Sequence, residues 1–324
     1  MNTAELNGKW LVIVNVFAAS RKAGSIWKKA AALMEAEGIS YEVKYTGGRY
    51  NATELAHKAC EAGFRRFVAV GGDGTVHDVM NGIAGYADVN GLRLSDFTIA
   101  VIPLGSGNDW VKSFGISKNM KAAVGLLKDA HTVRQDVVKV SLQDPAGNDT
   151  DVRYMANVAG IGLDARVCEI VNRKKEQGYR GKKLYVSALL YCIRHRVPVR
   201  AKVICDGKEI FNGKYLSLGF GVGKYSGGGM RQTPLAELGD GLLDVTVIPD
   251  IPLWIIAKEV PKLFTGTFHK VSVLTLAKCR SVSIIPECQA DAEPVEVDGE
   301  VIGRGLTTME VLPEQINVIM KDPR

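Results

Sequence analysis

The stretch that decides the fold reads Phe67-Val68-Ala69-Val70-Gly71-Gly72-Asp73-Gly74-Thr75. Its apolar residues predict a buried strand, and the glycine-rich turn that follows brings together backbone N–H groups that can bind phosphate. A carboxylate in such a turn repels phosphate unless a cation or a network of donors balances its charge. Asp73 therefore indicates a nucleotide bound with a cation. A plain turn in which Asp73 caps the following helix explains these residues equally well.

The chain around this turn alternates short apolar runs with helical patterns, which is typical of βαβ units. We expect helices at about 25–37 and 52–62, a further helix from about residue 76, and strands at 10–14, 41–45, 67–70 and 98–102. Strands that are apolar throughout are buried on both faces, so they predict a parallel sheet covered by helices on each side. Ligands of such sheets bind at the carboxyl ends of the strands, where Asn15, Gly71–Thr75 and Leu104–Asp109 fall.

Beyond about residue 135 the pattern becomes rich in strands. We expect helices at about 164–175 and 183–194, and strands at 137–142, 152–158, 199–205, 214–220, 242–248, 271–276, 281–285, 295–298 and 308–312. Turn signals such as Asp206-Gly207 and Asp298-Gly299 separate the strands. The predicted fold is an α/β N-terminal domain with a Rossmann-like parallel sheet over residues 1–135, and a C-terminal β-sandwich domain over 136–311. The tail at about 312–324 is expected to pack back on the first domain.

Composition narrows the class of protein. The sequence has 324 residues and a net charge of +6, and no run approaches the roughly 20 apolar residues of a membrane span. The N-terminus lacks the pattern of a signal peptide. The six cysteines are scattered, which is typical of reduced thiols and not of a disulfide or zinc framework. We expect a cytoplasmic protein.

Positive charge gathers between residues 173 and 202, where ten lysines and arginines are opposed only by Glu176. The simple interpretation is a solvated helical face. The functional interpretation is peripheral contact with anionic lipid headgroups. Nucleic acid is not expected as a partner, because the run lacks interleaved aromatic residues and a recognised binding module.

A second turn follows the strand at 98–102 and reads Pro103-Leu104-Gly105-Ser106-Gly107-Asn108-Asp109. Its glycines permit close approach of a backbone, Ser106 offers a hydroxyl, and Asn108 or Asp109 can cap the next helix. An ordinary capped loop also explains this segment. Its position beside the first turn favours phosphate binding.

Together these segments resemble the catalytic family of diacylglycerol kinases, which includes bacterial soluble lipid kinases and is related to the sphingosine kinases. The resemblance rests on 71–82, 103–109, 228–230, 234–236, 240–245 and 297–300, whose order and spacing span nearly the whole chain. It implies a nucleotide domain like those of NAD kinase and phosphofructokinase, followed by a β-sandwich lipid-substrate domain. It also implies transfer of the γ-phosphate of Mg-ATP to the free hydroxyl of a diacylglycerol-like lipid, in a cleft between the domains at the membrane surface. The segment 16–19 departs from the family, which often has proline and then Ser-Gly after the residue matched by Asn15.

The resemblance also implies roles for single residues. ATP would be contacted by Asn15, Thr46, Gly71, Gly72, Asp73, Gly74, Thr75 and Ser106, and Asp73 would also be a catalytic acid. The Asp240 carboxylate and the main-chain carbonyls near Glu237 and Leu242 would form a structural magnesium site, since oxygen ligands suit a hard cation. Glu300 matches the general base. Asp298 remains a rival base, and by its local pattern Glu300 is a hairpin residue beside the Asp298-Gly299 turn.

Several alternatives stay open. Within the kinases, a sphingoid base is an alternative acceptor, and the distantly similar NAD kinases have a soluble one. A regulatory protein that binds ATP and lipid without turnover belongs to a different class, and a homodimer is also left open. We expect His77 on an exposed or half-buried face of its helix, and Trp254 either at the rim of the core or in contact with acyl chains.

Overall fold

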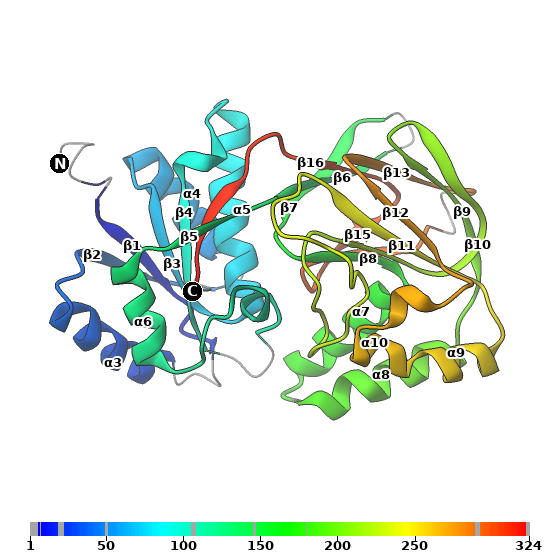
Figure 1. The fold of residues 1–324 in the computed structure, drawn as a ribbon, viewed down its shortest axis with the longest axis horizontal. Helices are drawn as coiled ribbons and strands as arrows, with labels where there is room; N and C mark the ends of the chain where they lie inside the picture. The colour runs from blue at the N-terminus through cyan, green and yellow to red at the C-terminus, as the bar shows by residue number, and fades with distance from the viewer. Residues whose placement is uncertain are drawn as a thin grey trace. The chain divides into compact units, whose positions relative to one another are not determined.

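The computed structural model in Figure 1 describes residues 6, 8–18, 23–48, 51–104, 108–144, 147–179, 181–288 and 292–321. The chain forms two units, residues 1–137 with 313–324, and residues 138–312. Each unit has its own sheet and its own hydrophobic core.

The first unit is built on a sheet with the strand order β2-β1-β3-β4-β17-β5. Its elements are β1 (Trp10–Val14), α3 (Ala23–Ala36), β2 (Tyr41–Tyr45), α4 (Asn51–Ala62), β3 (Arg66–Gly71), α5 (Asp73–Val89), η1 (Leu94–Asp96), β4 (Thr98–Pro103), η2 (Trp110–Phe114), α6 (Met120–Asp129), β5 (Thr132–Gln135) and β17 (Ile316–Ile319). Strand β17 runs parallel to β4 and antiparallel to β5. The chain therefore returns to the first sheet after it has formed the second unit.

Helices cover both faces of this sheet, which explains why its central strands are apolar throughout. Trp10, Val12 and Val14 of β1 pack into one cluster with α3 and α6. Helix α4 contacts β1 and α5 contacts β3 on the other side (Figure 1). The predicted parallel sheet with helices on each side is confirmed.

The second unit is an antiparallel β-sandwich with inserted helices, as the sequence predicts. Its elements are β6 (Val138–Gln143), β7 (Asp149–Met155), β8 (Val158–Gly162), α7 (Leu163–Glu176), α8 (Lys182–Arg194), β9 (Val199–Cys205), β10 (Lys208–Gly221), β11 (Leu243–Pro249), α9 (Leu253–Glu259), α10 (Pro261–Thr265), η3 (Phe268–Lys270), β12 (Thr275–Cys279), β13 (Ser281–Pro286), β14 (Pro294–Val297), β15 (Glu300–Arg304) and β16 (Leu306–Val311). The long strand β10 pairs with β9 along its first part and with β8 and β11 along its second. This sharing of β10 lets the strands wrap around the core that contains Val203, Leu218, Phe220 and Val245.

The structure corrects several details of the sequence interpretation. The strand expected at 152–158 is two strands, because the chain turns between Met155 and Val158. Strand β12 begins at Thr275, later than expected, and α5 begins at Asp73, earlier than expected. The expectation for His77 is wrong, since this residue is only 2% exposed. Helix α5 packs against both α4 and β3, so little of its surface is left for water.

Helices α4 and α5 pack unusually closely at Gly82. A Cβ atom at this position would lie 2.4 Å from the Thr53 carbonyl oxygen and 2.6 Å from Ala56 Cβ. Glycine costs helix stability relative to alanine, and here the close approach of α4 requires it. Gly125 of α6 is the opposite case, because a Cβ there would meet nothing within 4 Å.

These two helical glycines give a matched pair of substitutions. Gly82→Ala should lower the unfolding free energy of the first unit by about 1–3 kcal/mol, because the added methyl group must push α4 away. Gly125→Ala should raise it by about 0.5–1 kcal/mol, because helix propensity improves without a clash. The measurement is thermal unfolding followed by the fluorescence of the buried Trp10, Trp27 and Trp110. Equal shifts for both variants would contradict the close packing at Gly82.

Candidate functional site

The turn after β3 is tight, and its geometry requires glycine. Gly71 pairs with Pro103 of β4, and its carbonyl oxygen accepts the N–H of Leu104 at 2.6 Å. A Cβ on Gly71 would lie 2.1 Å from Thr75 Oγ1, so a larger residue would displace the start of α5. Gly74 is exposed, and a Cβ there would meet nothing within 4 Å. The turn is therefore tightly packed at Gly71 and exposed to solvent at Gly74.

Asn15 ties the end of β1 to this turn. Its backbone N–H donates to the Val70 carbonyl at 3.1 Å, and its Nδ2 donates to Thr75 Oγ1 at 3.0 Å. Its Oδ1 accepts the N–H of Phe17 at 3.0 Å. These bonds bring Asn15 and Gly71–Thr75 together at the carboxyl ends of β1 and β3.

Thr46 lies at the same edge, just after β2. Its N–H donates to the Val14 carbonyl at 3.0 Å. Its hydroxyl is buried and has no hydrogen-bond partner among the residues that the structure describes. A buried hydroxyl without a partner costs about 1–3 kcal/mol, so a polar ligand at this edge would relieve a penalty that the protein carries alone.

Asp73 joins the first turn to the second. It does not cap its own helix, since the N-cap of α5 is Gly72 and receives no side-chain hydrogen bond. Instead, Asp73 Oδ2 accepts the N–H of Asp109 at 3.0 Å and Oδ1 accepts the N–H of Trp110 at 3.1 Å. The carboxylate thus holds the start of η2 against α5. Ser106, in the middle of the second turn, lies outside the described residues.

In the second unit, Glu300 is the first residue of β15 and pairs with Val297 of β14. The two residues between them, Asp298 and Gly299, have φ angles of 50° and 92°, as a tight hairpin turn requires. The Asp298 carboxylate accepts N–H groups from Ala156, Asn157 and Val158 at 2.8–3.0 Å. These three bonds also explain why β7 and β8 are separate strands.

Further contacts fix the turn beside Glu300. The Gly299 carbonyl accepts hydrogen bonds from Asn172 Nδ2 and Cys168 Sγ of α7, each at 2.9 Å, and its N–H donates to Glu296 Oε2 at 2.8 Å. The backbone that carries Glu300 is therefore held from α7, β14 and the β7–β8 junction. Sequence reasoning missed Asn172 and Cys168, because neither belongs to a motif and their partner lies more than 120 residues away.

The loop of Glu237, Asp240 and Leu242, for which the resemblance implies a magnesium site, directly precedes β11. Asp240 Oδ1 accepts the N–H of Leu242 at 3.0 Å, and Oδ2 lies 2.7 Å from Lys278 Nζ. Lys278 of β12 pairs across the sheet with Asp244, whose Oδ2 is 3.5 Å from the same ammonium group. Burial raises the pKa of Asp244 to about 6, and Lys278 acts in the opposite direction.

The positive charge that neutralises Asp240 and Asp244 is therefore the ammonium group of Lys278, on the neighbouring strand β12. Within the described ranges, no group of three or more His, Cys, Asp or Glu side chains is arranged to hold a metal ion. The oxygen donors of the loop fit a divalent cation in kind, but that cation would compete with Lys278 for Asp240. The sequence pattern did not single out Lys278, because its partners depend on the pairing of β11 with β12.

Two acids lie near the hairpin turn, the half-buried Asp164 and the buried Glu296. Asp164 of α7 and Glu296 of β14 approach β8 at Gly160, where a Cβ would lie 2.8 Å from Asp164 Cβ and 3.1 Å from Glu296 Oε1. Ser217 Oγ donates to Asp164 Oδ2 at 2.5 Å. Burial raises the pKa of Asp164 to about 6 and that of Glu296 well above its usual range.

These acids should make the second unit less stable as the pH rises from about 4 to about 6. The folded state keeps Asp164 protonated up to about pH 6, whereas the unfolded chain loses that proton near pH 3.9. Between these values the folded state binds more protons, so its stability falls with pH, by about 3 kcal/mol for Asp164 alone. Asp164→Asn should make the thermal midpoint depend less on pH between about 4 and about 6. Glu310→Gln, an exposed acid on β16, is the control, and equal pH profiles for the two variants would contradict this assignment.

No helix within the described parts of the chain is both long enough and apolar enough to cross a membrane.

Each of the two units matches a known protein-family model. Residues 9–140 match the family model of the diacylglycerol kinase catalytic domain, and residues 157–320 match that of the YegS C-terminal NAD kinase beta sandwich-like domain. A protein of Mycobacterium tuberculosis (strain H37Rv) named "Diacylglycerol kinase" is 26% identical over 87% of this chain and 85% of its own length. A Stenotrophomonas maltophilia protein named "Probable lipid kinase YegS-like" is 28% identical over 89% of this chain and 90% of its own length.

Solved structures show the same fold. A Bacillus anthracis chain described as a diacylglycerol kinase superposes with a TM-score of 0.69 at 20% identity, over 97% of each chain. Another Bacillus anthracis chain gives a TM-score of 0.75 at 23% identity, again over 97% of each. With both family models in the expected order, the chain belongs to the diacylglycerol kinase-like family of lipid kinases, which phosphorylate an alcohol group.

Proposed function

We propose that this protein transfers the γ-phosphate of Mg-ATP to the free hydroxyl of a diacylglycerol-like lipid. The main observation in support is the turn Gly71–Thr75, which is so tight that no Cβ fits at Gly71. Asp73 connects this turn to the second turn by two hydrogen bonds. This turn lies in the part of the chain that matches the diacylglycerol kinase catalytic domain. The enzyme would be cytoplasmic and would reach its substrate at the membrane surface.

The first unit would bind the nucleotide. In this proposal the phosphates of ATP lie against the backbone of Gly71, Gly72, Gly74 and Thr75, at the N-terminus of α5, where the helix dipole favours negative charge. The buried Thr46 hydroxyl and the Asn15 side chain would complete the contacts, together with Ser106. Magnesium bound with ATP would neutralise phosphate charge next to Asp73. Phosphoryl transfer depends chiefly on such positioning and charge balance.

The second unit would supply the base. Glu300 would take the proton of the lipid hydroxyl as its oxygen bonds to the γ-phosphorus and the bond from phosphorus to ADP breaks. Asp298 is the poorer candidate, because its carboxylate accepts three backbone N–H groups that define the junction of β7 and β8. Asp298 would instead position the turn from which Glu300 projects.

Glu300→Gln should lower kcat by about 100-fold or more, because the base is lost while the side chain keeps its shape. Its thermal midpoint and its affinity for ATP should stay close to those of the wild type. Asp298→Ala is the matched comparison and should lower the thermal midpoint, because three N–H groups lose their acceptor. A Glu300→Gln protein that loses ATP binding would show that Glu300 is structural.

The assay for this variant also tests the function itself. Radiolabelled ATP is supplied with diacylglycerol, a sphingoid base or NAD, and the labelled product is identified. Label in diacylglycerol supports the proposal, whereas label in the sphingoid base or in NAD selects one of the other acceptors. If ATP raises the thermal midpoint but no acceptor is labelled, the protein is a non-catalytic binder of ATP and the proposal fails.

The loop of Glu237, Asp240 and Leu242 is the structural magnesium site in this proposal. Magnesium there must compete with Lys278 for Asp240. Lys278→Met should therefore lower the magnesium concentration at which the thermal midpoint rises, because the acids lose their ammonium partner and a divalent cation relieves their repulsion. Lys278→Arg keeps the charge and serves as the control. If magnesium leaves the midpoints of the wild type and of Lys278→Met unchanged, this loop is not a magnesium site.

A further inference from the structure

We propose that the outer face of α8, with the adjoining start of α9, inserts into the surface of an anionic lipid bilayer. The residues of this α8–α9 face are Lys183, Val186, Leu190, Tyr191, Arg194, Leu253 and Trp254. The proposal rests on the proposed function only in that the lipid substrate lies in a membrane. All of these residues belong to the second unit.

Helix α8 is apolar on both sides, which is unusual for a surface helix. Its inner side places Ala188, Cys192 and Ile193 in a cluster with α7 and Leu216. On its outer side Val186, Leu190 and Tyr191 are 49%, 62% and 57% exposed. Leu190 lies four residues after Val186, which is about one helical turn, and Tyr191 is next to Leu190. The three side chains therefore form one stripe along the helix. Such a stripe in contact with water indicates a surface that is covered when the protein works.

Basic residues bracket this stripe. Lys183 and Arg194 lie near the two ends of α8 on its exposed side, and the sequence of the helix contains no acidic residue. In the described part of the chain, no carboxylate forms an ion pair with Arg173, Lys183 or Arg194. Other arginines and lysines of the 173–202 region already have acidic partners, as Arg200 has Glu287 and Lys202 has Glu209. The unpaired charges favour an anionic surface with an apolar interior, as a bilayer of anionic lipids presents.

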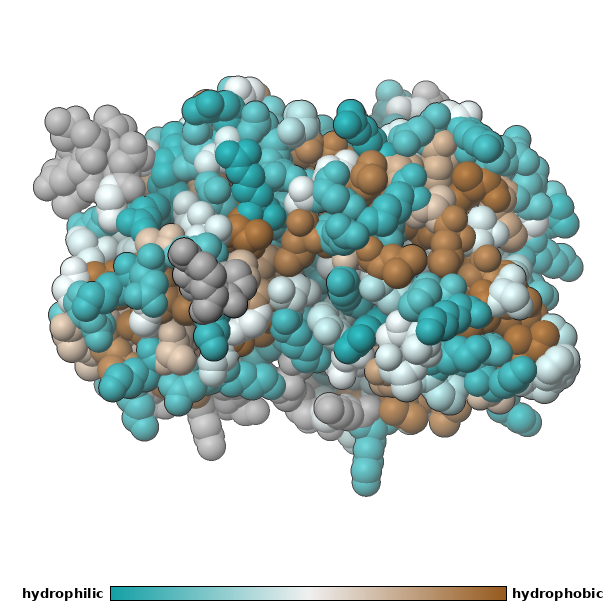
Figure 2. All heavy atoms as spheres, viewed as in Figure 1, coloured by the Kyte–Doolittle hydropathy of each residue, from teal (hydrophilic) through white to brown (hydrophobic). Residues whose placement is uncertain are grey.

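Helix α9 packs on the same core as α8 and also exposes apolar residues. Its Ile256 is buried in the cluster that also holds Ala188 and Cys192 of α8, so both helices pack on one core. Figure 1 shows both helices at the same end of the second unit. Leu253 and Trp254, at the start of α9, are 47% and 68% exposed. Figure 2 shows hydrophobic residues mixed with charged ones at this end of the second unit. Tryptophan and tyrosine are well suited to the boundary of a bilayer, because their rings are apolar with one polar group.

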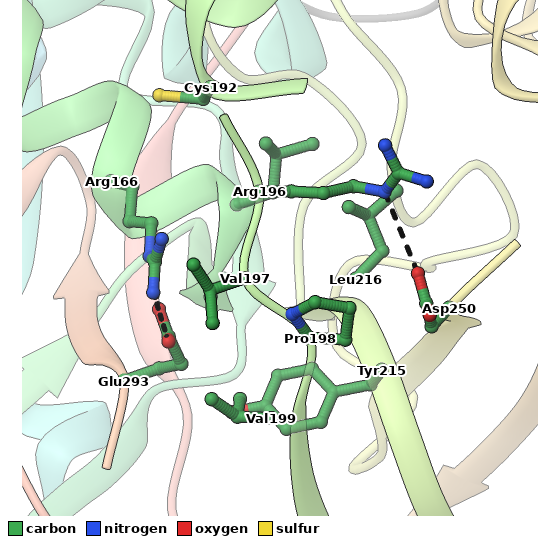
Figure 3. Close-up of a pocket in the computed structure, with 12 residues that line it drawn as sticks. Arg166, Cys192, Arg196, Val197, Pro198, Val199, Tyr215, Leu216, Asp250 and Glu293 are labelled. Carbon is green, nitrogen blue, oxygen red and sulfur yellow. Dashed lines mark hydrogen bonds and ion pairs between the residues drawn. The ribbon is translucent and has the colours of Figure 1, made fainter. Parts of the chain in front are cut away.

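Two ion pairs lie beneath the end of α8. Figure 3 shows the small pocket at the end of α8, with Arg166 paired to Glu293 and Arg196 paired to Asp250. Arg166 comes from α7, and Arg196 follows α8 directly. These ion pairs connect α7 and the segment after α8 to the sandwich.

Trp254 allows the proposal to be tested on the unlabelled full-length protein. The other tryptophans, Trp10, Trp27 and Trp110, are 2–3% exposed, so Trp254 is the one that a lipid surface would reach. The protein is titrated without ATP with vesicles of phosphatidylcholine, and with vesicles of phosphatidylcholine and phosphatidylglycerol in equal parts. We expect a blue shift of the emission, and quenching by brominated acyl chains, only with the anionic vesicles and less at high salt. No shift with either vesicle would overturn the proposal.

Matched variants locate the contact. Leu190→Ser should weaken binding to the anionic vesicles about tenfold, because an inserted leucine side chain is lost. Val89→Ser on α5 is the control, since Val89 is an apolar residue 81% exposed in the other unit. Equal binding by the two variants would overturn the proposal. So would a wild-type dimer in solution that Leu190→Ser converts to monomers, because the face would then be covered by a second copy of the chain.

A kinase assay separates this proposal from the proposed function. With lipid substrate dispersed in detergent, Leu190→Ser should match the wild type, whereas with substrate in anionic vesicles it should be about tenfold slower. Equal rates for variant and wild type on vesicles would overturn the docking face. If the wild type binds anionic vesicles but labels no lipid, the kinase proposal fails and the docking face stands.

Discussion

The carboxylate of Asp73 accepts the backbone N–H groups of Asp109 and Trp110, and the arrangement of the first unit's turns depends on this contact. Together with the Leu104 N–H that donates to the Gly71 carbonyl, this contact fixes the segment after β4 relative to α5. The contact also places a negative charge at the start of a helix, where the helix dipole stabilises it. The acid in the turn that we propose to bind phosphate is thus part of the scaffold without any nucleotide or cation.

A second carboxylate has the same kind of role in the other unit. Asp298 gathers three N–H groups at the junction of β7 and β8, and the turn that it begins leads directly into Glu300. In both units a half-buried set of backbone donors orients an acidic residue and the segment next to it. Main-chain donors of this kind are fixed by the fold, so they hold the aspartate side chain and the backbone next to it in place.

The sequence predicts what local pattern can encode. The strands at 41–45 and 199–205 have the predicted bounds, and the Asp298-Gly299 turn has the predicted backbone, because apolar runs and Asp-Gly pairs act over a few residues. The break between β7 and β8 was not predictable, because its cause is a carboxylate about 140 residues further along the chain. The pairing of Lys278 with Asp240 likewise depends on which strands lie side by side, and His77 is buried because α5 packs against α4 and β3.

Strand β17 has a consequence for how the protein is made. Residues 316–319 lie between β4 and β5, yet they follow the whole of the second unit in the chain. During translation, the whole second unit must therefore be synthesised before β17 can complete the sheet of the first unit. Until then β4 has an unpaired edge, which is a site for association with other chains. The nascent N-terminal unit is thus a candidate client for chaperones, even though its other strands have already emerged.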